Sequence, residues 1–202
     1  MRKSCWVMIL VASTGILLSL FGCYMPENFQ AKLTVNKDGS YVFMCEGTFF
    51  DSYMDFISHI NIEEKYKKAE LAAAEKRLND IGFKDLKNLG DFHYKGFFQK
   101  IGKPGEEYYF LSKEDKIFIV QSPKNGTLII TAIPPTQWQI QNLEMERVNI
   151  NGTLTVSVAE NSEVVDHNAQ DASKLNGAFK EYTWKIVSPR ANPFIIIKSN
   201  IQ

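Results

Sequence analysis

Residues 31–50, AKLTVNKDGSYVFMCEGTFF, carry the clearest structural signal in this chain. Apolar and polar residues alternate on both sides of Asp38-Gly39, and a period of two is typical of a β-strand with one buried face. Glycine supplies the positive φ that a tight turn between two strands requires. The stretch therefore predicts a β-hairpin, with Cys45 as a small buried hydrophobic residue in its second arm.

A helical pattern follows this hairpin. Residues 61–64, Asn-Ile-Glu-Glu, form a capping box, and Gly82 stands where a helix commonly ends. The apolar positions between them form one narrow stripe: Leu71, Ala74, Leu78 and Ile81. A narrow stripe predicts a helix that lies on one face of a sheet.

The rest of the chain predicts strands separated by turn sequences. The expected hairpins pair 92–101 with 106–111, pair 116–122 with 127–133, and turn at Asn151-Gly152 into 153–158; later strands are expected around 164–165, 181–187 and 194–198. Residues 51–60 and 136–146 give no clear pattern. We expect an α+β fold, a largely antiparallel β-sheet with one long N-terminal helix packed on it, in which residues 31–202 form a single domain.

The first 22 residues have the order of a secretory signal peptide. Arg2 and Lys3 precede an uncharged run from Cys5 to Phe21, which is slightly shorter than the roughly 20 residues of a membrane-spanning helix. The end of the run, Leu20-Phe-Gly-Cys23, resembles the lipobox of bacterial lipoproteins. That resemblance implies cleavage before Cys23 and a lipid thioether on its thiol, with acyl chains such as palmitate. The alternative is an uncleaved membrane anchor in which Cys23 is incidental.

Cleavage would make residues 23–30 a lipidated N-terminus and short tether. The partner would then be a membrane in the bacterial cell envelope. Tyr24 is not the aspartate associated with inner-membrane retention in enteric bacteria, which favours the outer membrane in a Gram-negative host. With Cys5 removed and Cys23 lipidated, Cys45 has no partner for a disulfide. Removing Arg2 and Lys3 lowers the 23 basic residues to 21 against 23 acidic ones, which gives no electrostatic case for a nucleic-acid partner.

Several short motifs occur in a characteristic order. They are Lys32–Ser40, then Gly152–Val158, then Glu163–Ala169 and Tyr182–Ile186. Together they resemble the LppM-type envelope lipoprotein domain. The resemblance implies an opening β-hairpin, a helix and further sheet, with an envelope-associated role and no catalytic residues.

The chain has no Gly-x-Ser-x-Gly elbow, no Walker loop, no His-Glu-x-x-His and no Cys-x-x-Cys. His59, His93 and His167 are widely separated in the sequence. We therefore expect a protein that is not an enzyme and uses neither a metal nor another cofactor.

Aromatic residues are concentrated in 92–98, FHYKGFF, and in 108–110, YYF. One interpretation is an aromatic surface for a glycan, a lipid headgroup or a peptide. The other, which we favour, is that the rings fill the core, because one face of each strand must be buried. The candidate ligand-binding residues are Phe92, Tyr94, Tyr108, Tyr109 and Trp138.

Three functions remain open at this point. The first is a membrane-anchored envelope lipoprotein that acts as a non-enzymatic binding or accessory module for a lipid, glycan or peptide. The second is a structural lipoprotein that holds another envelope protein, and the third is a hydrolase. A deep apolar pocket would favour the first, a flat apolar patch the second, and converging carboxylates or histidines the third.

Overall fold

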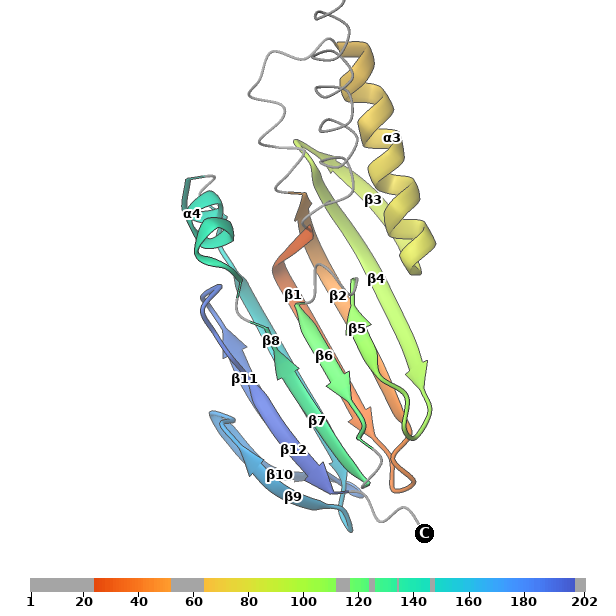
Figure 1. Ribbon diagram of the computed structural model, residues 1–202, viewed down its shortest axis with the longest axis vertical. Coiled ribbons are helices and arrows are strands. Elements are labelled where there is room, and N and C mark those ends of the chain that lie inside the picture. Colours follow the sequence, from red (N-terminus) through yellow and green to blue (C-terminus); the bar gives the residue numbers. More distant parts are fainter. Residues whose placement is uncertain are drawn as a thin grey trace, which may run out of the picture.

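The computed structural model describes residues 24–51, 64–111, 117–123, 126–133, 135–145 and 148–198. These residues form strands in two sheets, together with two helices (Figure 1). The elements are β1 (Tyr24–Val35), β2 (Tyr41–Asp51), α3 (Glu64–Ile81), β3 (Phe83–Gly90), β4 (His93–Gly102), β5 (Tyr108–Phe110), β6 (Phe118–Gln121), β7 (Thr127–Ala132), α4 (Gln137–Met145), β8 (Asn151–Ala159), β9 (Glu163–His167), β10 (Asp171–Asn176), β11 (Phe179–Ile186) and β12 (Phe194–Lys198).

The seven-stranded sheet has the order β10-β11-β8-β1-β2-β4-β3, and the five-stranded sheet has the order β5-β6-β7-β12-β9. Neighbouring strands in both sheets run antiparallel, apart from the parallel pair β1–β8. The α+β class and the mainly antiparallel pairing agree with the sequence, but the single expected sheet is two sheets.

The two sheets share one hydrophobic core. Phe43 of β2 lies 5.1 Å from Phe118 and 5.0 Å from Phe110, measured between ring centroids. Buried residues from both sheets and from α3 belong to the same cluster. Apolar side chains alternate along β1 and β2, so the inner face of the large sheet is covered by the small one.

The structure confirms two of the predicted hairpins and contradicts two others. The β1–β2 hairpin is confirmed, with Gly39 at a φ of 80°, and so is the β6–β7 hairpin. The pairing of 92–101 with 106–111 is wrong, because the chain changes sheet after Gly102. Phe98 and Tyr108 instead stack across the core, with ring centroids 6.1 Å apart. The turn at Asn151-Gly152 is also wrong, since both residues belong to β8.

The expected tether is part of the fold. Residues 24–30 form the first part of β1, where Tyr24 pairs with Asp51 of β2 and Asn28 pairs with Asn151 of β8. The side chains of Tyr24 and Met25 are buried. Their burial stabilises a strand at the place where the sequence predicted a spacer.

Helix α3 is not N-terminal, because β1 and β2 precede it. Its predicted apolar stripe is confirmed: Ala74 and Leu78 are buried, and Leu71 and Ile81 pack against the same core. The proposed cap at Asn61 and most of 51–60 lie outside the described residues, whereas 137–145 form α4. In the part of the chain that is described, neither helix has the length and hydropathy needed to cross a membrane.

Candidate functional site

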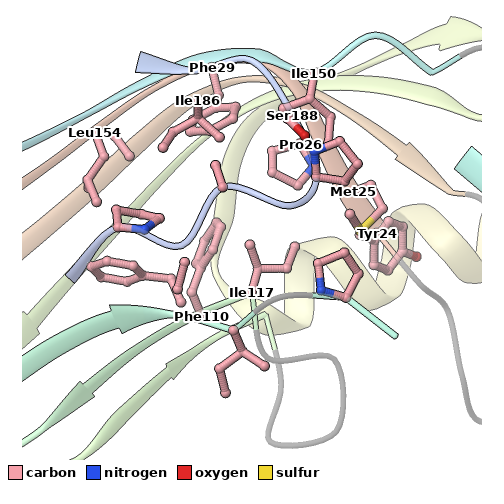
Figure 2. A pocket seen from close by; sticks show the side chains of 18 of the residues that line it. Tyr24, Met25, Pro26, Phe29, Phe110, Ile117, Ile150, Leu154, Ile186 and Ser188 are labelled. Atoms are coloured by element: carbon pink, nitrogen blue, oxygen red, sulfur yellow. The ribbon is translucent and has the colours of Figure 1, made fainter. Parts of the chain in front are cut away.

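An apolar cavity of about 230 Å³ lies between the two sheets. Figure 2 shows Phe110 and Ile117 on one side of it, and Phe29, Leu154 and Ile186 on the other. The start of β1 and the segment between β11 and β12 complete the wall. The cavity is therefore lined by residues from both sheets that are far apart in the sequence.

The lining of this cavity has very few hydrogen-bonding groups. Thr136 and Ser188 contribute hydroxyl side chains among mainly apolar neighbours. Four of the lining residues are prolines: Pro26, Pro135, Pro189 and Pro193. Proline has no backbone N–H, so loops rich in proline can border an apolar space with fewer unsatisfied donors.

The sheet makes room for the cavity through a row of small residues. Phe29 of β1 pairs with Gly152 on one side and with Gly47 on the other, and Gly47 pairs with Gly96. A Cβ at Gly152 would collide with the ring of Phe29, and one at Gly47 would collide with the backbone oxygen of Asn28. Gly152 thus lets the Phe29 ring lie across the inner face of the sheet and form part of the cavity wall, whereas Gly47 leaves room for the backbone of β1.

A β-bulge stands beside this row. The register between β1 and β2 shifts between Pro26 and Phe29. A bulge bends its strand and re-aims the side chains around it. The residues that precede the bulge, Tyr24, Met25 and Pro26, are buried and line the cavity.

Tyr24, which lines the cavity, also belongs to a polar cluster between β1 and α3. The Tyr24 hydroxyl donates to the Ala74 carbonyl over 3.2 Å, and Arg77 Nε donates to the Tyr24 oxygen over 3.4 Å. The same guanidinium lies 4.0 Å from the fully buried carboxylate of Asp51. Burial raises the pKa of Tyr24 to about 12, against the lowering effect of the bond from Arg77. Tyr24 is therefore neutral at physiological pH and connects α3 to β1.

A second hollow lies over strands β8, β1, β2 and β4 of the seven-stranded sheet. It has a volume of about 450 Å³ and is lined by polar groups that include Gln30, Glu46, Thr48, Lys95 and Thr153. Its side chains offer hydrogen bonds but no cluster of metal ligands. Among the described residues, no group of three or more His, Cys, Asp or Glu side chains is placed to hold a metal ion.

Of the predicted ligand-binding residues, the four whose side chains the structure describes do not line the apolar cavity. Phe92 and Tyr94 are buried in the core, as the core-filling interpretation expects. Tyr108 is partly buried against Phe98, and the Tyr109 hydroxyl donates to Glu107. Trp138 lies in α4, and its side chain lies outside the described part of the structure, as does Cys23.

Sequence reasoning missed the residues that do form the cavity. No motif marks them, because they come from strands and connecting segments that are far apart in the sequence and that only the fold brings together. One signal was present in Tyr24-Met25-Pro26, which is too apolar for a solvated tether. A residue this close to the proposed anchor would be expected to be polar unless it packs against something.

Comparison with known proteins gives distant likenesses to solved structures. No family model matches the chain, and no curated protein matches it. Among solved structures, the NMR structure of the folded domain of LppM from Mycobacterium tuberculosis is similar over 89% of this chain and 93% of its own, with 9% sequence identity and a TM-score of 0.39. These values describe a distant structural resemblance and nothing more.

Proposed function

We propose that this chain is a lipid-anchored protein of the bacterial envelope that binds one hydrocarbon chain in the cavity between its sheets and catalyses no reaction. The apolar cavity is the observation that carries the proposal. We further propose a distant relationship to the LppM-type domains, based on the order of sequence motifs in 32–40 and 152–186.

The size of the cavity limits its ligand. An apolar cavity of about 150 Å³ takes up benzene, and pockets for drug-sized ligands measure about 300–1,000 Å³. At about 230 Å³, this cavity suits part of a single acyl chain better than a whole lipid. A headgroup would remain outside, where water and the protein surface can solvate it.

The cavity also favours a binding module over a structural protein. A flat apolar patch would support the structural alternative, but the exposed large hydrophobic residues in the described structure are spread over several elements: Tyr66, Leu89, Ile101, Met145, Val165, Leu175 and Val187. The cavity, by contrast, concentrates apolar surface at one place. Its wall includes Tyr24, directly after the proposed lipid attachment at Cys23, so a bilayer would lie close by as the source of the ligand.

The proposal can be tested by filling the cavity. Ala191 lines it, on the segment between β11 and β12, and Ala191→Leu would add volume there. The full chain is expressed in a bacterial envelope, and its bound lipid is measured by native mass spectrometry, with cis-parinaric acid as a fluorescent fatty-acid probe. The wild-type protein should bind the probe, and Ala191→Leu should bind it at least tenfold more weakly, because the larger side chain occupies part of the empty cavity.

Ala178→Leu is the matched control, since Ala178 is exposed and does not line the cavity. It should bind the probe as the wild type does, and both variants should keep the wild-type melting temperature. Absence of bound lipid and of probe binding in the wild-type protein would refute the proposal. Equal binding by both variants would place the ligand elsewhere.

A further inference from the structure

One end of the seven-stranded sheet brings together the proposed anchor point and two exposed segments. Tyr24 pairs with Asp51, and Phe50, next to Asp51, pairs with His93. His93 in turn pairs with Gly90 of β3. The start of β1 and the β3–β4 turn therefore lie at the same end of the strands of this sheet, and Leu89, which is 54% exposed, lies at that end.

The first turns of α3 extend past this end of the sheet (Figure 1). The helix is attached to β1 where the Tyr24 hydroxyl bonds the Ala74 carbonyl. Glu64 begins the helix ten residues earlier, which is about 15 Å at the helical rise. Lys67 lies 5.5 Å from the ring centroid of Phe92, so the first turns of α3 stay next to the β3–β4 turn.

This end carries positive charge and exposed apolar groups. We name it the anchor end and define it as Glu64–Lys68 of α3 together with residues 87–91. The anchor end contains four lysines, at 65, 67, 68 and 87, and two acidic residues, Glu64 and Asp91. It is therefore positively charged, whereas the whole chain has a net charge of zero. The side chain of Tyr66 is 60% exposed among these lysines.

We propose that the anchor end lies against the surface of an anionic phospholipid bilayer. The inference rests on the lipid attachment at Cys23 that belongs to the proposed function. Consecutive Cα atoms are 3.8 Å apart, and β1 begins at Tyr24, so no spacer separates the lipid from the fold. Tyrosine is enriched at membrane interfaces, and lysines near an anionic surface are attracted to it.

Two exposed positions on opposite ends of the sheet provide the test. Leu89 belongs to the anchor end, whereas Ile101 is 68% exposed near the other end of β4, eight residues or about 26 Å from His93. An environment-sensitive nitrobenzoxadiazole label is attached to Leu89→Cys or to Ile101→Cys in the lipidated full chain. Cys45 is 1% exposed, and its burial raises the pKa of the thiol to about 12, so it should not take the label.

The labelled proteins are reconstituted into vesicles of phosphatidylcholine with phosphatidylglycerol. A label at position 89 should shift its emission to the blue and gain at least twofold in intensity, while a label at 101 should keep its spectrum in water. Replacing Lys65, Lys67 and Lys68 by Ser should reduce the effect at 89, and so should vesicles of phosphatidylcholine alone. The same spectrum at both positions would overturn the inference.

Vesicle flotation separates this result from the proposed anchor. Protein that floats, but shows no difference between positions 89 and 101, is anchored without using the anchor end. Protein that does not float, and in which mass spectrometry finds no lipid on Cys23, lacks the anchor, and both the attachment and the inference then fail. Cavity binding of the fatty-acid probe is measured separately and depends on neither label.

Discussion

At the scale of single residues, Phe29 connects the bend of the large sheet with the cavity. The Phe29 ring lies over its cross-strand partner Gly152, in the space that a side chain at position 152 would need. The same ring lines the cavity. Glycine in a strand usually weakens it, because glycine has no side chain to pack. Here the neighbouring ring supplies that packing, so the glycine and the phenylalanine depend on each other.

We predict that Gly152→Ala lowers the free energy of unfolding by about 1–3 kcal/mol, because the new methyl group collides with the Phe29 ring. In combination with Phe29→Leu, which lacks the outer ring atoms, the loss should be smaller than the sum of the two single effects by about 1 kcal/mol. Urea unfolding of the four proteins measures this coupling.

Gly47→Ala provides the contrast. Its new methyl group would meet the backbone oxygen of Asn28, which a change at Phe29 does not remove. The same combination with Phe29→Leu should therefore give little relief. Additive effects for Gly152 and Phe29, or equal relief for both glycines, would contradict the role that we give to the ring.

At the scale of elements, the sequence predicted the features that depend on neighbouring residues alone. The alternation around Gly39 specified the β1–β2 hairpin, and the stripe containing Ala74 and Leu78 specified the buried face of α3. Strand β3 was missed, because FKDLKNLG shows no period-two alternation and most of its residues are exposed. Its position depends on pairing with β4, a contact that the sequence of β3 alone does not encode.

We predict that deletion of residues 24–30 abolishes the cooperative fold. These residues pair with β2 on one side, and the last three pair with β8 on the other, so their loss leaves the ends of two strands unpaired and opens the cavity. A spacer, by contrast, could be removed without harm. Near-ultraviolet circular dichroism and thermal unfolding measure the effect.

The control for this deletion is an insertion of ten Gly and Ser residues between Cys23 and Tyr24. It changes the chain outside β1 and should leave the melting temperature unchanged. If the deletion variant unfolds with the same midpoint as the wild type, β1 begins later than Tyr24 and the original expectation of a tether is restored.

At the scale of the whole molecule, the cavity could not be predicted because residues from nearly the whole chain surround it. Tyr24 begins the described structure and Pro193 lies close to its end, yet both line the same space. The partition of the strands into two sheets decides this arrangement, and after Gly102 the chain moves from one sheet to the other. Short motifs carry no information about such non-local pairing, so the aromatic strands were easier to notice than the actual cavity.

The same ten-residue insertion makes a prediction about the orientation of the molecule on the membrane. A flexible linker of this length has a root-mean-square span of about 17 Å, so it would free the anchor end from the bilayer. The attraction between the anionic lipids and Lys65, Lys67 and Lys68 would then be the main force that keeps the anchor end at the membrane. Salt screens this attraction, with a screening length of about 8 Å at physiological ionic strength. The label at position 89 should therefore lose most of its blue shift at high salt in the insertion variant and only part of it in the protein without the insertion, while both proteins still float with vesicles. Equal shifts in the two proteins at high salt would mean that the direct attachment of β1 to the lipid is not what holds this end against the membrane.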